Sequence, residues 1–474
     1  MMQRRRYIVS YSTVEPVIVS SIDAVSRKYR LDPSQYNADV EKIIRHCAKN
    51  NITLKSLKDL GWIRETYLPN RFSRSYTGSN VLGTIMVGTS SMLDMKLPRD
   101  MRIFLNEMKN ADDLYIEDND ILISRSGTVG TSTLCGASYR GCVASDDCIR
   151  LRCDIEHVGF VAAYMKTKIG LTLLAKDSHG KVIKHLKTED VENLKIPQFD
   201  KATIRKVNDK MLSAKDAFDL ARHSYEQVEV MLEKYLGKLV PPQFLNCSVV
   251  PFGSLKLTRL DPHMYDPYSN FVTHEIIRSN DFKKLGEIAD VISVARFKRH
   301  YLEEENENSI GLYSSSDIVR ARLTPSKYIS RVLNKKNIKD CAVQEGDILI
   351  PCSGAYGGIL GKGIMAGKNL SGKPISQHVL RIVKKDDSEI KFDFVAAYLC
   401  SFTFGYPLIT ATRFGKDIPE LDPSAIREIP IPYIENKMQQ EIGQAYRKAI
   451  ELQERGNALE AEAEQIIYDS YYKN

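Results

Sequence analysis

The sequence predicts an α+β fold in which two repeated mixed α/β modules are separated by long antiparallel coiled-coil helices. Three observations support this prediction. The chain repeats itself once, a helical seam pattern follows each copy, and each copy mixes strand-like and helix-like segments. With 474 residues, 43% of them hydrophobic, the chain is long enough to form more than one core.

The repeat consists of four short strings that recur in the same order. RLDP at 30–33 recurs at 259–262, DILI at 120–123 at 347–350, FVAAY at 160–164 at 394–398, and IP at 196–197 at 431–432. The distance between copies stays between 227 and 235 residues, which argues against chance matches. Residues 1–29 and 65–110 show no counterpart, so we expect the two modules to differ there.

The tail after each copy has apolar residues in steps of three and four, the spacing of a coiled-coil seam. Small residues of the second tail, such as Gly456, leave room for Met211, Phe218 and Tyr225 of the first. We therefore expect the two helices to pack on one another. The alternative, in which each helix only covers its own module, stays open.

These patterns divide the chain into four segments: a first module at 1–200, a central helix at 201–237, a second module at 238–433 and a C-terminal helix at 434–474. Gly237 and the prolines that follow it are expected to end the central helix. Segments 120–124 and 347–350 are typical of buried strands that precede glycine turns, whereas 159–175 and 393–404 are typical of helices.

The positive charge lies on the modules. The formal net charge is +7, but 201–237 carries only +1 and 434–474 carries −3, which leaves +9 for the rest. This distribution is expected if the modules touch phosphates and the helices touch protein, although a solvated basic face is the alternative for any single residue. The candidate DNA contacts are the basic and hydrogen-bonding residues of the module loops: Arg71, Arg74, Tyr76, Arg125, Ser126, Lys181 and Lys184 in the first module, and Arg296, Lys298, Arg320, Arg322, Arg413 and Lys416 in the second.

The cysteines and the hydropathy predict a cytoplasmic protein. Nine cysteines are scattered without a C-x-x-C pair, and we interpret the cluster of Cys135, Cys142, Cys148 and Cys153 as buried reduced thiols rather than as a zinc site. No stretch of about 18 uncharged apolar residues exists, so no membrane span is expected.

The chain lacks recognisable catalytic motifs. An amino-methyltransferase grips its target amine with Asp/Asn/Ser-Pro-Pro-aromatic, and the nearest strings, at 240–243 and 266–268, do not fit. Residues 367–373 spell G-x-x-x-x-G-K, but Pro374 stands where a phosphate-binding loop needs Ser or Thr. We therefore expect no catalytic, cofactor-binding or metal-binding residue in this chain.

The repeated modules resemble the specificity subunit of type I restriction–modification systems. Each module has a DILI strand before a Ser-Gly turn and closes with Ile-Pro before a long helix. The first closing segment has Gly180, KHL at 184–186, Glu189-Asp190 and Leu194, and the second has Gly415, Ile418, Leu421, Ile426 and IPIP at 429–432. The resemblance extends over nearly the whole chain.

The resemblance implies a non-catalytic chain with two target-recognition domains. Each domain would read one half of a split, asymmetric DNA site, and the helices would fix the distance between the halves. Two partner methyltransferase subunits would carry S-adenosylmethionine and methylate adenine, and a motor-nuclease subunit can join. Three alternatives stay open: methylation-based phage defence without this nuclease, an enzyme with an unrecognised site, and a protein-binding scaffold. The DNA sequence read does not follow from the chain alone.

Overall fold

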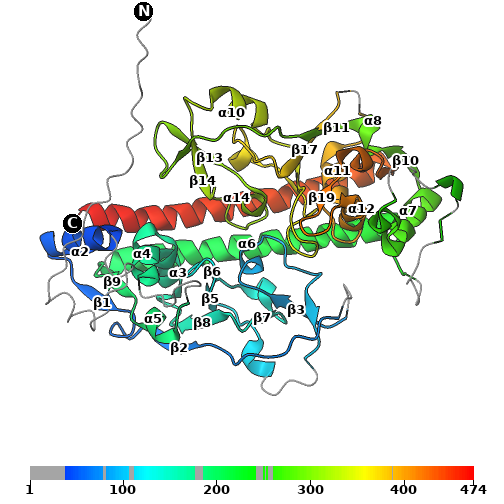
Figure 1. The fold of residues 1–474 in the computed structure, drawn as a ribbon. Coiled ribbons are helices and arrows are strands. Elements are labelled where there is room, and N and C mark those ends of the chain that lie inside the picture. The colour runs from blue at the N-terminus through cyan, green and yellow to red at the C-terminus, as the bar shows by residue number, and fades with distance from the viewer. Residues whose placement is uncertain are drawn as a thin grey trace, which may run out of the picture.

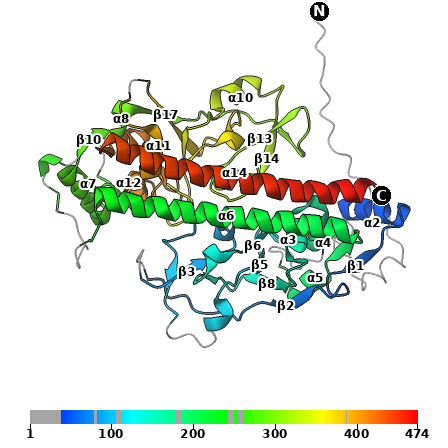
Figure 2. The same cartoon turned by 180° about the vertical axis from the view of Figure 1, so that it is seen from behind.

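A computed structural model of the chain describes residues 38–77, 82–105, 111–176, 185–241, 249–250, 252–254, 260–386 and 388–473. Two long helices, α6 (Lys201–Leu236) and α14 (Asn436–Lys473), run side by side, with one module on each side of them in Figure 1. From behind, the pair crosses the face of the molecule without other elements over it (Figure 2). The predicted fold class is confirmed.

Each module is built on a four-stranded antiparallel sheet, and the strand order is the same in both. The predicted strands at 120–124 and 347–350 are the third strand of each sheet, β5 and β15, in which every residue is buried. The order in module 1 is β2 (Ile63–Tyr67), β8 (Cys148–Cys153), β5 (Ile121–Ser124) and β6 (Ser132–Leu134), and in module 2 it is β11 (Ala289–Ser293), β17 (Val379–Lys384), β15 (Ile348–Pro351) and β16 (Ile364–Met365).

Smaller sheets complete each module. A two-stranded pairing joins the start of each module to its end, β1 with β9 and β10 with β20, and a three-stranded sheet lies beside the main one. The bounds are β1 (Leu54–Ser56), β9 (Lys195–Pro197), β4 (Arg102–Ile103), β3 (Thr84–Val87) and β7 (Val143–Ala144) in module 1, and β10 (Asp281–Lys284), β20 (Pro430–Tyr433), β12 (Tyr301–Leu302), β14 (Lys327–Ser330), β13 (Ser309–Leu312), β18 (Arg413–Phe414) and β19 (Glu420–Leu421) in module 2.

The expected module helices form but are shorter than predicted. The segment 159–175 is broken at Thr167, whose side chain accepts a hydrogen bond from the amide of Gly170 and starts a new helix. The segment 393–404 stops being helical at Leu399. The helices are α2 (Ala38–Lys49), α3 (Val158–Lys166), α4 (Lys168–Ala175), α5 (Thr188–Glu192), α7 (Pro267–Ser279), α8 (Leu285–Ile288), α9 (Ser315–Ile318), α10 (Lys335–Cys341), α11 (Phe392–Leu399), α12 (Gly405–Ala411) and α13 (Pro423–Ile426).

Some predicted features fall at the edge of the described chain. The first RLDP string lies outside the described residues, and in the second, Pro262 begins a 3₁₀ helix. The central helix ends as expected, because Gly237 takes a positive φ of 93° after Leu236. Within the described ranges, no single helix is long and apolar enough to span a membrane, although the bent pair α3–α4 passes that test jointly.

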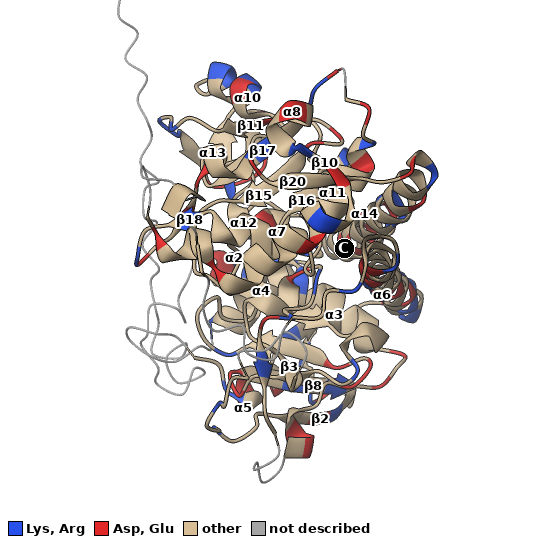
Figure 3. Ribbon diagram, turned by 90° about the vertical axis from the view of Figure 1, so that its right-hand side faces the viewer, with Lys and Arg blue, Asp and Glu red and all other residues tan. Residues whose placement is uncertain are grey.

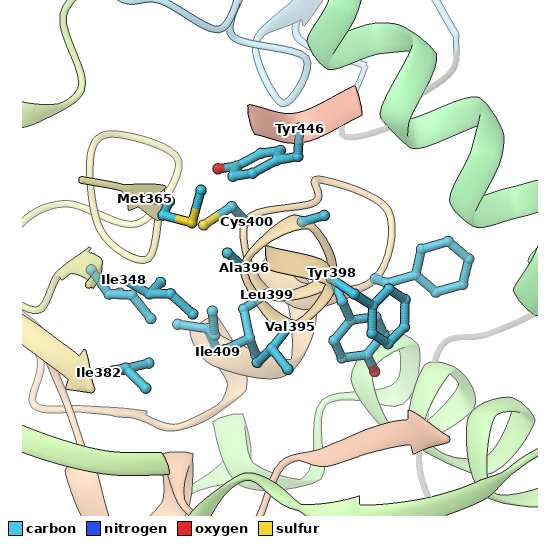
Figure 4. Packing of buried hydrophobic residues seen from close by; sticks show 14 of the residues in the cluster. Ile348, Met365, Ile382, Val395, Ala396, Tyr398, Leu399, Cys400, Ile409 and Tyr446 are labelled. Atoms are coloured by element: carbon cyan, nitrogen blue, oxygen red, sulfur yellow. The ribbon is translucent and has the colours of Figure 1, made fainter. Parts of the chain in front are cut away.

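The core of module 2 continues into the helix pair. Figure 4 shows Ile348 and Ile382 of the sheet, Val395, Leu399 and neighbouring residues of α11, and Tyr446 of α14 in one apolar cluster. Module 1 has an equivalent cluster that reaches Val207 and Met211 of α6. Cys135, Cys142, Cys148 and Cys153 are buried in module 1, as predicted for structural thiols.

The two long helices pack antiparallel along the predicted seam. A Cβ added at Gly456 would lie 2.7 Å from the Phe218 ring, so the absence of a side chain there admits the phenyl group. Toward the C-terminal end of α6, the Tyr225 hydroxyl donates to Gln453 Oε1 at 3.3 Å and the Tyr235 hydroxyl donates to Glu441 Oε2 at 2.7 Å. The alternative of two helices that never meet is therefore wrong.

Each module is also clamped to its own helix by a carboxylate. Asp219 of α6 accepts from the amide of Ala137 at 2.8 Å, and Glu454 of α14 accepts from the amide of Asn369 at 2.8 Å. A Cβ at the neighbouring glycine, Gly136 or Gly367, would collide with the respective carboxylate. The two clamps occupy equivalent places, which indicates that the duplication includes the helices.

Replacing Gly456 with leucine tests the seam. The new side chain would overlap the Phe218 ring, and overpacking of this kind typically costs about 1–3 kcal/mol. We expect a lower midpoint in thermal unfolding for Gly456→Leu, with recovery when Phe218→Ala is added. Ala461→Leu, on an exposed position of the same helix, is the matched control and should leave the midpoint unchanged.

Candidate nucleic-acid interface

The matching sheets allow the two modules to be compared residue by residue. β5 pairs with β8 so that Ser124 faces Cys148, and β15 pairs with β17 so that Pro351 faces Val379. Upstream of these strands, residues 71–93 correspond to residues 296–318 at a constant spacing of 225 residues, so that β3 corresponds to β13. The expectation that 65–110 has no counterpart in the second half is therefore wrong for 71–93.

Within this stretch, the motif R-F-x-R-x-Y occurs twice, at 71–76 and at 296–301. The Arg74 guanidinium carbon lies 5.8 Å from the Phe72 ring centroid, and that of Arg299 lies 5.7 Å from the Phe297 ring. The phenylalanines are partly buried against small apolar clusters of their modules. An arginine stacked on an anchored aromatic ring keeps its N–H edge free for other acceptors.

The rest of each motif is open to solvent. Tyr76 is 50% exposed and its counterpart Tyr301 is 48% exposed, while Arg71 and Arg296 are both exposed. An ungapped comparison of the two halves at a spacing of 225 residues would have found this motif, because Arg, Phe, Arg and Tyr coincide at four of its six positions. Arg299 and Tyr301 are the residues that the sequence-based set of DNA contacts omitted.

Four predicted contacts of module 1 line one cleft. Arg71, Arg74, Tyr76 and Arg125 face it together with two carboxylates, Asp146 and Asp147. Arg74 forms an ion pair and hydrogen bond with Asp146, an interaction that raises the pKa of the arginine. Arg125 Nη1 lies 3.7 Å from Asp147 Oδ1, and Ser126 donates its hydroxyl hydrogen to the same carboxylate. The five predicted residues Arg71, Arg74, Tyr76, Arg125 and Ser126 are thus brought together.

This cleft continues into a second one between the modules, because Gly88, Thr89, Ser90 and Met101 line both. The second cleft is lined from module 1 by residues 126–128 and from module 2 by Gly357, Arg320 and Lys362. Seen nearly along the helix axes, the modules lie above and below one another beside the helix pair, with Lys and Arg on both (Figure 3). The predicted contact Arg320 therefore reaches the shared cleft.

The modules touch each other directly at this cleft. Short segments at 93–95 and 319–321 pair through backbone hydrogen bonds, from the Met95 amide to the Val319 carbonyl and from the Ala321 amide to the Leu93 carbonyl, both 2.8 Å. The two segments run antiparallel with Asp94 opposite Arg320, so each module contributes one short segment from a corresponding part of its chain to the contact. Burial raises the pKa of Asp94, which lies in this contact, to about 7.

The remaining predicted contacts that the structure describes do not line these two clefts. Arg322 donates to the Asn457 carbonyl at 2.9 Å and lies 3.5 Å from Glu464, so it holds α14. Arg413 is only 8% exposed, stacked 4.1 Å from the Tyr356 ring centroid. Lys416 is exposed between β18 and β19, and Arg296 and Lys298 are exposed on the module 2 motif. Lys181 and Lys184 lie outside the described residues. DNA contact by each of these residues stays a prediction.

A protein-family model decides the identity. The model described as the type I restriction modification DNA specificity domain matches residues 50–229 and again residues 278–463. The chain belongs to this family. It is a DNA specificity subunit with two target-recognition domains, and members of the family recognise DNA without catalysing a reaction.

Solved structures of low sequence identity include two such subunits. The chain is 15% identical to the S subunit of a type I restriction–modification system from M. genitalium, with 88% of this chain and 95% of that chain covered and a TM-score of 0.35. It is 14% identical to the HsdS subunit from Thermoanaerobacter tengcongensis, covering 89% and 96%, with a TM-score of 0.25. A third structure, described as concerning complex assembly and conformational transition of the type I R-M system, is 15% identical, with 89% and 97% covered and a TM-score of 0.26. No curated protein matches.

The exposed arginines at the start of each R-F-x-R-x-Y motif are expected to contact phosphates. Arg71→Ala and Arg296→Ala should each weaken DNA binding for all sequences alike and lower the slope of log affinity against log salt by about one. Binding titrations over a range of salt concentrations measure this. Lys201→Ala removes the same charge from the exposed start of α6 and should change neither quantity.

Proposed function

We propose that this chain selects a bipartite DNA site for a partner adenine methyltransferase, with each module reading one half of the site. The observation that carries the proposal is the arrangement of two equivalent modules on opposite sides of one antiparallel helix pair (Figure 1). Such a frame presents two reading surfaces at a fixed distance, and that is what recognition of two separated half-sites needs.

The chemistry of the clefts suits the backbone and base edges of DNA. Arginines lie beside serine, threonine and glycine residues, a combination that binds phosphate oxygens and still leaves guanidinium groups for guanine. The net positive charge outside the two helices favours the same partner. In this proposal double-stranded DNA lies along the clefts of both modules.

The uncovered face of the helix pair is the proposed docking surface for the methyltransferase. Two apolar residues of α6, Leu220 and Val230, are 54% and 65% exposed, although most apolar residues of the helix are buried. We propose two methyltransferase subunits per chain, each supplying S-adenosylmethionine, with room for a motor-nuclease subunit in the same assembly. The complex would act in the cytoplasm.

A methylation assay tests this division of labour. The purified chain alone should not methylate DNA. Co-expression with a methyltransferase encoded beside it should give sequence-specific adenine methylation. Transfer of labelled methyl groups from S-adenosylmethionine is the measurement. Methylation by the isolated chain, or by the partner with unchanged specificity when this chain is absent, would contradict the proposal.

Lengthening the helix pair tests the spacing role. Seven residues inserted in α6 between Arg222 and Glu229, and seven in α14 between Asn457 and Glu460, keep the heptad spacing of each helix and move the modules apart by about 10 Å, which also breaks the backbone pairing between them. We expect the recognised spacer to grow by about three base pairs, since base pairs stack about 3.4 Å apart. Mapping of methylated sites would show this, and altered half-sites with an unchanged spacer would refute the role.

A further inference from the structure

The segments that precede β8 in module 1 and β17 in module 2 form the same type of turn. At 145–148, the Cys148 amide donates to the Ser145 carbonyl at 3.1 Å and the Asp147 amide donates to Ser145 Oγ at 3.2 Å. At 376–379, the Val379 amide donates to the Ser376 carbonyl at 3.1 Å and the His378 amide donates to Ser376 Oγ at 3.4 Å. We call these segments the strand-entry turns. In both, the outer residues are buried and the two central residues are half-buried.

The hydrogen bonds that hold each strand-entry turn in place also occur in both modules. The amide of Arg125 donates to the Asp147 carbonyl at 3.0 Å, and the amide of Cys352 donates to the His378 carbonyl at 2.9 Å. A serine of the Ser-Gly turn holds the side chain at the third position: Ser126 binds the Asp147 carboxylate, and Ser353 Oγ lies 2.7 Å from His378 Nδ1. The backbone is therefore the same in both modules, and the chemistry at the two central positions differs.

In module 1 both central side chains are carboxylates that hold arginines. Asp146 pairs with Arg74 and Asp147 with Arg125, and all four line the module 1 cleft. The Asp146 side chain is 13% exposed and that of Arg74 is 35% exposed, so the carboxylate lies behind the guanidinium. An arginine anchored in this way has fewer rotamers to lose and can only donate, which suits the two acceptors of guanine.

In module 2 the turn carries an amide and an imidazole instead. Gln377 has no charge to hold Arg299, and its Nε2 atom lies 2.9 Å from His378 Nε2. Arg299 instead donates to the Tyr301 hydroxyl at 3.2 Å. A glutamine amide offers one donor and one acceptor, the pair that matches N6 and N7 of adenine.

We propose that the two central residues of each strand-entry turn determine which base its module selects. Asp146 and Asp147 are positioning residues that fix Arg74 and Arg125 as guanine readers, whereas Gln377 contacts adenine directly. The inference rests on the proposed function, because it assumes that each module reads one half-site. It adds that the two half-sites differ because a duplicated turn carries different side chains.

Selection from a pool of randomised duplexes tests the inference, using the full chain in complex with its co-expressed methyltransferase. Asp146→Asn keeps the size of the side chain but removes the anchor of Arg74, so guanine preference at one position of one half-site should fall about 10- to 100-fold. Gln377→Glu leaves only acceptors, so one position of the other half-site should change from adenine to cytosine. The spacer and the untouched half-site should stay as in the wild type.

Glu156→Gln is the matched control, since it removes the same charge from an exposed side chain of module 1 and should select the wild-type sequence. Thermal unfolding of the complexes shows whether Asp146→Asn remains folded. If it does not, the half-buried change Gln377→Glu, checked for folding in the same way, decides the question. Unchanged base preferences in the folded variants, or an equal loss of affinity for every sequence, would overturn the inference. A wild-type complex that selects no split sequence would refute the proposed function itself.

Discussion

The antiparallel packing of α6 against α14 determines where every other part of the molecule lies. Arg222 of α6 donates to the carbonyls of Met95 and Asp94, at 3.1 and 3.4 Å. Asn457 of α14 bonds the Ala321 carbonyl and the Leu323 amide, at 2.9 and 2.7 Å. Each long helix thus holds the segment through which its own module pairs with the other module, so a shift along the helix seam would have to break the contact between the modules as well.

These contacts bury polar side chains between the helix pair and the modules, a place where apolar side chains are more usual. Arg222, Asn457 and Glu460 are each less than a tenth exposed, and Glu460 accepts from Lys166 Nζ at 2.8 Å. Burial also raises the pKa of Glu464 nearby to about 7. Buried polar groups of this kind contribute little net stability but penalise every register that leaves them unpaired. We interpret them as the reason why the two helices have one alignment.

The sequence was most informative where periodicity and identity carry the signal. The seam residues Phe218 and Gly456 meet as predicted, and the buried strands before the glycine turns form, because apolar spacing alone specifies such features. It was less informative for helix ends such as Thr167, where one side-chain hydrogen bond outweighs a continuous apolar pattern. Charge alone could not separate Arg322, which holds α14, from Arg74, which lines the cleft, because the difference lies in tertiary partners.

The arrangement of the candidate site follows from the duplication more than from any single residue. One backbone is used twice, with the same R-F-x-R-x-Y motif, the same Ser-Gly turn and the same strand-entry turn, so selection could change the side chains at 146–147 without disturbing 377–378. The spacing between modules depends on the helices and on the 93–95 and 319–321 contact, none of which includes those positions. Under the proposed function, distance and base preference are therefore held by separate sets of interactions. This separation would allow a two-module reader to change one half of its target while the other half and the gap between them stay fixed.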